Sequence, residues 1–69
     1  MRRQIAPLFE RTADVLEQSA ALAEFHAQWE ERAGHHAVAR EERDRAAWAR
    51  ENAQRARDRA AARSVLPHD

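Results

Sequence analysis

The sequence contains no cysteine, lysine or tyrosine, only one glycine, two prolines and four aromatic residues. The absence of cysteine excludes a disulfide framework and a zinc site of the finger type, and it is common in reducing compartments. No apolar run approaches the roughly eighteen residues of a membrane-spanning helix, and no apolar segment of the kind found in secretory signals follows the first three residues. We therefore expect a soluble cytoplasmic protein without membrane contacts.

The chain has 69 residues and a formal net charge of zero. This length allows one small domain, 1–69, of a size that usually needs a disulfide, a metal or a partner subunit for stability. A zero net charge argues against a strong electrostatic hold on nucleic acid or anionic membranes. Because a glycine-rich phosphate loop, a serine–histidine arrangement and room for an enclosed pocket are all lacking, we expect no catalytic site, no cofactor and no small-molecule ligand.

A heptad repeat of apolar residues predicts a first helix at about 6–33. The apolar rows are adjacent on a helical wheel and cover roughly half of its circumference, which is wider than a coiled-coil seam. Pro7 suits the first turn of a helix, where its missing N–H is not needed. The large members of these rows are Ile5, Leu8, Phe9, Val15, Leu16, Leu22 and Trp29, and the next row is wholly acidic with Glu10, Glu17, Glu24 and Glu31.

Alanine, arginine and glutamate, which are good helix formers, predict a second helix at about 37–63. Its apolar seam is narrow and consists of alanines, with Arg43, Arg50 and Arg57 along one flank. We expect residues 1–5 and 64–69 to be tails, since Pro67 disfavours the helical conformation at Leu66.

Gly34, the sole glycine, separates the two predicted helices. In an antiparallel hairpin the numbers of facing residues add to a nearly constant value, and pairing the small residues centres the turn beside Gly34, a usual helix-ending residue. The predicted helix–helix seam is Ala13, Ala20, Ala27, Ala39, Ala46, Ala53 and Ala60, and the predicted ion pairs are Glu24 with Arg43, Glu17 with Arg50 and Glu10 with Arg57. We therefore predict an all-α, antiparallel two-helix hairpin with its turn at Gly34.

The alternative is one continuous helix of nearly the whole chain. A glycine inside a helix costs only about 1 kcal/mol, so Gly34 alone would not interrupt it. However, the large apolar face of the first half does not continue in phase beyond Gly34. The hairpin is therefore the favoured interpretation.

The turn region resembles the helix–turn–helix of a tetratricopeptide unit, which keeps small residues where this chain has Ala27, Gly34, Ala39 and Ala46. The resemblance covers less than half of the chain and implies the same helix–turn–helix. Glu30 and Arg43 stand where that motif commonly has large aromatic residues, and no second unit recurs at its period of about 34 residues. The resemblance therefore supports the turn and implies no function.

Three histidines, His26, His35 and His36, lie near the turn together with Glu30 and could be imagined as metal ligands. Adjacent histidines point in different directions on a helix, and no pair has the spacing of a known zinc motif. We expect two solvated turn histidines, with His26 at the edge of the apolar face, and no metal site.

The second helix carries an excess of arginine, and Arg45, Arg55, Arg59 and Arg63 lie away from the flank that faces the first helix. These side chains either form a solvated surface or contact nucleic acid or an acidic partner. Trp48 also lies off the alanine seam. It is either an interface residue or a surface ring that stacks on neighbouring arginines through cation–π contacts.

The narrow alanine seam cannot cover the wide apolar face of the first helix. An exposed apolar stripe of this length usually marks an interface. We expect a homodimer in which two first helices pack together as a four-helix bundle, with Thr12, Ser19 and His26 helping to set the register. The residues expected in this interface are Ile5, Leu8, Phe9, Val15, Leu16, Leu22 and Trp29.

The function that we expect is thus a structural or regulatory interaction between proteins. A helical partner other than a second copy could cover the same stripe. The alternative function is a nucleic-acid-binding or transcription-associated accessory protein that uses the arginine-rich second helix.

Overall fold

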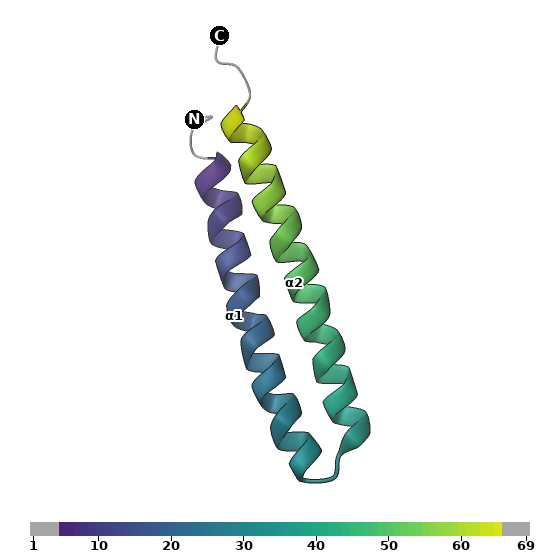
Figure 1. The fold of residues 1–69 in the computed structure, drawn as a ribbon. Helices are drawn as coiled ribbons and strands as arrows, with labels where there is room; N and C mark the ends of the chain where they lie inside the picture. The colour runs from purple at the N-terminus through teal and green to yellow at the C-terminus, as the bar shows by residue number, and fades with distance from the viewer. Residues whose placement is uncertain (1–4, 66–69) are drawn as a thin grey trace.

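A computed structural model describes residues 5–65 of the chain, with side chains from 6 to 63. Helix α1 spans Ile5–Arg32 and helix α2 spans His36–Val65. The two helices lie side by side and run in opposite directions (Figure 1). This arrangement confirms the predicted all-α helical hairpin and rules out a single continuous helix. The predicted tail residues 1–4 and 66–69 lie outside the described residues.

The helix bounds differ slightly from those predicted. Helix α1 already includes Ile5, and α2 begins at His36 and continues through Val65, two residues beyond the predicted end. A proline restricts the residue that directly precedes it, so Pro67 limits Leu66 and leaves Val65 free to be helical. Alanine and arginine, which fill the last turns of α2, favour this extension.

The turn is built around Gly34, whose φ angle of 85° lies in the left-handed region. The N–H of Gly34 donates to the carbonyl of Glu31 at 3.0 Å, and the N–H of His35 donates to the carbonyl of Glu30 at 2.7 Å. These two bonds form the Schellman arrangement, which satisfies the last free carbonyls of a helix that ends at glycine. The chain therefore reverses where the sequence predicts.

Helix α2 begins without the serine, threonine or aspartate that often caps a helix. The carbonyl of His35 accepts the first bond, from the N–H of Ala39 at 3.0 Å. The two glutamates of the last turn of α1 lie beside this end: Nδ1 of His35 donates to Oε1 of Glu30 at 2.8 Å, and His36 donates to Glu31. Negative charge near a helix N-terminus is favourable because the helix dipole is positive there.

Replacing Gly34 with alanine is expected to destabilise the protein by about 1–2 kcal/mol, because a left-handed conformation is unfavourable for residues with a Cβ atom. A Cβ atom added to Gly34 would meet nothing within 4 Å, so the loss would come from the backbone alone. Asparagine tolerates this conformation better and is expected to cost less. Urea denaturation of the two variants measures the difference, and equal stability of G34A and the unsubstituted protein would contradict it.

The contact between the helices consists of alanines. Each of the nine core residues is an alanine with at most 5% of its surface exposed, and no large side chain is fully buried among the described residues. The buried residues include all seven of the predicted seam and two more of α2, Ala49 and Ala56. Because alanine extends only one carbon from the backbone, two helices can approach closely along such a seam. The two helices are therefore in close contact, but large apolar side chains contribute little to the buried surface between them.

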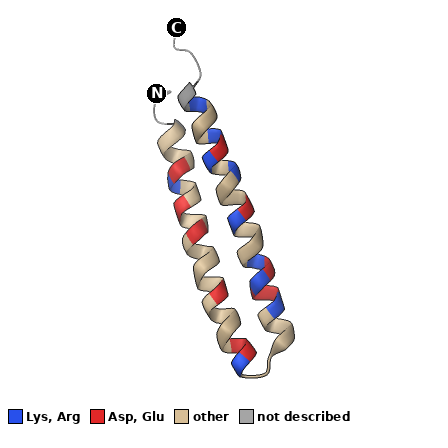
Figure 2. Ribbon diagram, in the orientation of Figure 1, with Lys and Arg blue, Asp and Glu red and all other residues tan. Residues whose placement is uncertain are grey.

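The seam separates the hairpin into two unlike faces. Residues one position after the seam on both helices are mainly charged. Figure 2 shows all charged residues, which are mainly acidic along α1 and mostly basic along α2. Residues one position before the seam include the exposed large apolar side chains. A step of one residue rotates a side chain by about 100°, so the two sets point to opposite sides. We call these the ion-pair face and the apolar face.

Candidate self-association surface

On the ion-pair face, three glutamates of α1 bind three arginines of α2. Nη1 of Arg43 donates to Glu31 at 2.9 Å, Nη2 of Arg50 donates to Glu24 at 2.8 Å, and Nη1 of Arg57 donates to Glu17 at 2.8 Å. The rows of opposite charge therefore meet as the heptads predict. The predicted partners are wrong, since each arginine binds the glutamate one heptad closer to the turn. The corrected pairs are Glu31 with Arg43, Glu24 with Arg50 and Glu17 with Arg57.

The shift follows from the direction in which side chains leave a helix. Side chains lean toward the N-terminus of their own helix. In this hairpin a glutamate of α1 leans away from the turn, whereas an arginine of α2 leans toward it. Pairs such as Glu24 and Arg50, separated by about 10 Å along the helix axis, therefore lean toward each other. Residues at the same level, such as Glu24 and Arg43, lean apart.

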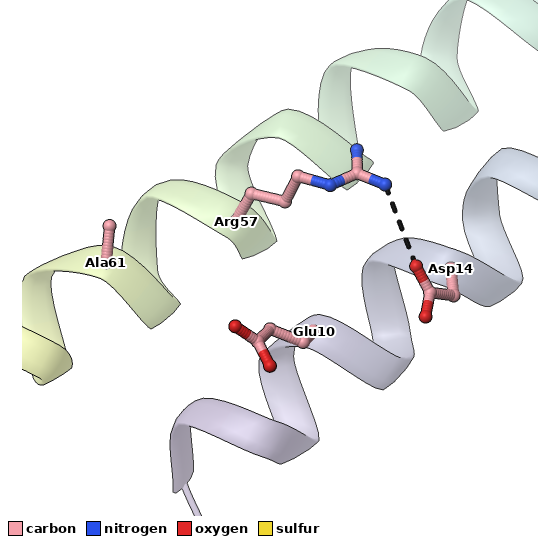
Figure 3. A pocket seen from close by; sticks show the side chains of 4 residues that line it. All are labelled: Glu10, Asp14, Arg57 and Ala61. Atoms are coloured by element: carbon pink, nitrogen blue, oxygen red, sulfur yellow. Dashed lines mark ion pairs between the residues drawn. The ribbon is translucent and has the colours of Figure 1, made fainter.

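Arg57 illustrates the same geometry at the open end of the hairpin (Figure 3). In addition to Glu17 it reaches Asp14, with 3.7 Å between Nη2 and Oδ1. Its predicted partner, Glu10, lines the same shallow hollow together with Ala61 but forms no ion pair with any residue that the structure describes. The predicted pair of Glu10 and Arg57 is thus replaced by Asp14 and Glu17.

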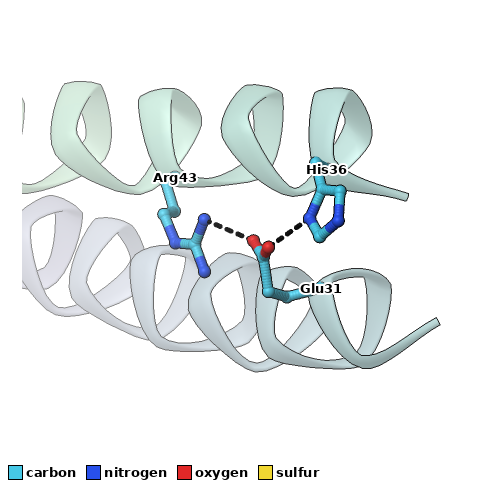
Figure 4. A network of polar contacts seen from close by, with 3 residues as sticks. All are labelled: Glu31, His36 and Arg43. Atoms are coloured by element: carbon cyan, nitrogen blue, oxygen red, sulfur yellow. Dashed lines mark hydrogen bonds and ion pairs between the residues drawn. The ribbon is translucent and has the colours of Figure 1, made fainter. Parts of the chain in front are cut away.

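Hydrogen bonds from the arginines shift several pKa values. Arg50 donates to both oxygens of Glu24, which lowers the pKa of Glu24 below its ordinary 4.5 and raises that of Arg50. Arg43 and then His36 lower the pKa of Glu31 by donating to its carboxylate (Figure 4). Bidentate bonds of this kind favour one geometry as well as the charged state. The ion-pair face thus helps to fix how the two helices lie against each other.

Stability is expected to fall as the pH decreases below about 4.5. Glu24 and Glu31 have lowered pKa values in the folded state, so the unfolded chain binds protons first. Their contribution is therefore fully present above the ordinary carboxylate pKa and is lost as the pH falls through the folded pKa values. The measurement is the urea midpoint between pH 6 and pH 3 at constant protein concentration. The variant with Glu24→Gln and Glu31→Gln should show a weaker dependence, and an unchanged slope would contradict this assignment.

The apolar face carries most of the large hydrophobic side chains that the structure describes. Leu8, Val15, Leu22 and Trp29 follow one another along α1 at seven-residue spacing, and each is between 56% and 64% exposed. Val38 and Trp48 of α2 are also exposed and lie on the same side. The hairpin thus exposes its large apolar residues and buries its small ones, which is the reverse of a stable monomeric core.

Phe25 extends this surface and is absent from the predicted interface. It lies at the outer edge of α1, is 55% exposed, and packs against Trp29 with 6.3 Å between ring centroids and 50° between ring planes. The other members of its heptad row are Arg11, Gln18 and Arg32. Because these residues are polar or charged, the apolar repeat did not include Phe25. Phe25 and Trp29 are four residues apart, which places two aromatic rings on one side of a helix. This spacing is the sequence feature that could have identified Phe25 as part of the surface.

Two of the residues predicted to self-associate are less exposed than the others. Phe9 and Leu16 are half-buried and pack on Ala13, and Leu16 also packs on Ala20. They therefore contribute to contacts within the chain and only border the apolar face. The side chain of Ile5 lies outside the described residues.

The predicted polar members of the interface all lie on the exposed surface of α1. The hydroxyl of Thr12 donates to the carbonyl of Leu8 at 2.9 Å, so this hydroxyl needs no partner from another molecule. His26 lines a shallow hollow with Phe25, Trp29 and Glu30. Thr12, Ser19 and His26 are exposed and alternate along the helix with the large apolar residues.

The arginine-rich side of α2 is only partly engaged. Arg45 binds Glu42 at 3.3 Å, whereas Arg55, Arg59 and Arg63 are exposed and form no ion pair with the residues that the structure describes. Trp48 likewise makes no cation–π or ring contact with the residues that the structure describes, so the stacking on neighbouring arginines, one of its two interpretations, is not observed there. The exposed arginines and Trp48 remain available to another molecule.

The candidate metal ligands near the turn form pairs, but the described residues contain no group of three suited to a metal. His35 and His36 bind separate glutamates, Glu30 and Glu31, and no group of three or more histidine, aspartate or glutamate side chains suited to a metal occurs between residues 5 and 65. In the same range, neither helix has the combination of length and apolarity needed to cross a membrane. Comparison of the chain with protein-family models, curated proteins and solved structures gives no match.

Proposed function

We propose that this protein acts without catalysis, by packing helix α1 of one copy against α1 of a second copy in a homodimer of four helices. The observation that carries the proposal is the reversed distribution of side chains. The core consists of alanines, whereas five large apolar side chains of α1 are more than half exposed, namely Leu8, Val15, Leu22, Phe25 and Trp29.

The magnitude of the apolar effect supports self-association. Burying a large apolar side chain contributes roughly 1.5–3 kcal/mol, so covering the exposed half contributes about 1 kcal/mol for each. Five such residues in each of two chains contribute on the order of 10 kcal/mol before the entropic cost of association. A dissociation constant of 1 μM corresponds to about 8 kcal/mol. The gross apolar contribution is thus of the same order as the free energy of a micromolar dimer, and the entropic cost of association is subtracted from it.

A second copy fits the surface better than a partner of different shape. The stripe from Leu8 to Trp29 extends over about 30 Å, nearly the whole length of α1, so another α1 can cover it from end to end. The same chain also supplies the matching pattern of large and small residues. In the dimer the apolar stripe becomes the core that the hairpin lacks by itself.

The mass of the particle in solution tests the proposal. Multi-angle light scattering at micromolar concentration should give twice the chain mass of 8.0 kDa. A well-folded particle of 8.0 kDa would exclude the homodimer. In that case, a different helical protein would be the remaining candidate to cover the apolar face.

Binding of nucleic acid is the second candidate, and it rests on Arg55, Arg59 and Arg63, which are exposed on α2. Against it, the arginines at 43, 50 and 57 are engaged by α1, and the formal net charge is zero. Phosphate contacts weaken steeply with salt. In a gel-mobility assay, retention of a DNA duplex at moderate as well as low salt would favour this candidate.

A further inference from the structure

Two symmetric arrangements bring two apolar faces together. If the two-fold axis is parallel to the helices, α1 lies over α2 of the partner. If the axis crosses the helices, α1 lies over the partner's α1 in the opposite direction. We infer that the axis crosses the helices and that α1 pairs with α1 in an antiparallel register that seats Arg11 on the aromatic pair of Phe25 and Trp29. This inference rests on the proposed self-association.

Helix α1 carries two rows of residues that alternate in steps of three and four. The inner row packs on α2 and begins with Phe9 and Ala13. The open row lies one residue earlier and consists of Leu8, Thr12, Val15, Ser19, Leu22, His26 and Trp29, all exposed. One residue corresponds to a rotation of about 100°, which is close to the angle between the two neighbours of a helix at the corner of a four-helix bundle. The shape of α1 thus provides for a second neighbour.

The corresponding open row of α2 decides between the two arrangements. It contains Val38 and Trp48 but is otherwise polar or charged, with Glu41, Arg45, Asn52, Arg55 and Arg59. Placing the stripe of α1 over this row would bury charges without partners, which is unfavourable. Placing α1 over α1 brings apolar side chains together and leaves the charged row of α2 beside its own copy, where long side chains can reach water.

The antiparallel direction also matches side chains by size. In the proposed register Leu8 faces the partner's His26, Val15 faces the partner's Ser19, and Leu22 faces the partner's Thr12. Each layer then combines a large apolar side chain with a smaller or partly polar one, which fills space evenly. In a parallel pair, by contrast, threonine would face threonine and histidine would face histidine. The alternation of the open row therefore favours the antiparallel pair.

Arg11 selects the register among the antiparallel alternatives. In the proposed register it lies opposite the partner's Phe25, beside the hollow that Phe25, His26, Trp29 and Glu30 line. A guanidinium group there can stack on the aromatic rings and lie near the Glu30 carboxylate. A shift by one heptad would instead place Arg11 opposite the partner's Arg32, with like charges together. The proposed register therefore also gives the hollow an occupant.

The same geometry accounts for the position of Trp48. The two-fold axis lies near residue 17 of α1, which is level with about residue 50 of α2 across the seam. Trp48 is therefore within one helical turn of the axis and faces the equivalent segment of α2 in the partner. On α2 the attraction between Glu41 and the partner's Arg59 is offset by repulsion between Arg45 and the partner's Arg55. The contacts of α1 therefore determine the register.

Interchain distances between spin labels test direction and register. The natural chain has no cysteine, so Q18C and R32C each carry one label, and dilution with unlabelled protein identifies interchain distances. In the proposed register the two labels at position 18 lie side by side, whereas those at position 32 are roughly 40 Å apart along the axis. A one-heptad shift would reduce the second distance to roughly 30 Å.

The possible outcomes separate this inference from the proposal on which it rests. Similar distances at both positions would show that the two-fold axis is parallel to the helices and would overturn the inference while the dimer stands. The absence of an interchain distance, together with the mass of a single chain, would overturn the self-association itself. A distance of roughly 30 Å at position 32 would overturn the contact of Arg11 with Phe25.

A matched pair of variants tests the aromatic contact directly. Arg11→Gln should raise the dissociation constant of the dimer roughly five- to thirtyfold, the range expected for losing two symmetry-related cation–π contacts at partly exposed sites. Arg40→Gln removes the same charge from an exposed position of α2 outside the apolar face and should leave the constant unchanged. Equal effects of the two substitutions would overturn the assignment of Arg11.

Discussion

Replacing Leu22 with arginine is expected to separate the dimer and largely unfold the protein. Leu22 is 56% exposed in the hairpin and lies in the middle of the apolar stripe, so the proposed dimer would bury it in both copies. Losing the burial of the exposed halves of two leucines costs about 2 kcal/mol, which by itself raises the dissociation constant roughly thirtyfold. Two charges placed in the interface without partners add to this loss. Because the hairpin core contains only alanines, the separated chains are expected to unfold.

Ala21 provides the matched control. It is the neighbouring residue, it is exposed on α1, and it lies outside the apolar face. Ala21→Arg adds the same side chain to the same helix and should change neither the mass in solution nor the helical signal in circular dichroism. If Leu22→Arg stays dimeric and folded, the stripe of α1 is not the interface. If both variants unfold, the effect of Leu22→Arg comes from the added charge on α1.

Enlarging Ala46 to leucine is expected to destabilise the protein although it adds apolar surface. Ala46 is 1% exposed and packs with Ala20 and Ala49 at the centre of the seam. A leucine there must push the helices apart, and overpacking of this kind typically costs 1–3 kcal/mol. Neighbouring alanine contacts along the seam would loosen as well. For a domain of this size the melting temperature should fall by roughly 10 °C.

Ala47 is the control for this prediction because it is adjacent and exposed on α2. Ala47→Leu should leave the melting temperature nearly unchanged, since the added side chain meets water in both the folded and the unfolded state. The comparison separates overpacking from a general effect of leucine on α2. An unchanged or raised melting temperature for Ala46→Leu would show that the seam has room and that close approach does not hold the helices together.

The helices and the turn could be predicted from local properties of the chain. The heptad repeat of α1 and the helix-forming composition of α2 depend on residues within a few turns of each other. Gly34 could be recognised because a left-handed residue at the end of a helix is nearly always glycine. The alanine rows also pointed to the seam, since both rows reach the turn in phase. These features need no knowledge of which atoms meet across the hairpin.

The partners of the glutamates could not be obtained in the same way. A seven-residue repeat allows Glu24 to face Arg43 or Arg50 equally well, and only the direction of the side chains in the folded hairpin selects Arg50. Phe25 was missed because its heptad row is mainly polar, although its spacing of four residues from Trp29 places the two rings on one side of the helix, as the structure shows.

The sequence by itself thus determined two helices, a turn at Gly34 and an alanine seam, because these follow from periodicity and from the conformational needs of single residues. Only the tertiary structure decided how charges pair across the seam and that Phe25 joins the exposed apolar side chains. Both depend on the level and direction of side chains on two helices that are distant in sequence. The exposed apolar face of α1 carries the function that we propose, in which a second copy supplies the core that the hairpin lacks.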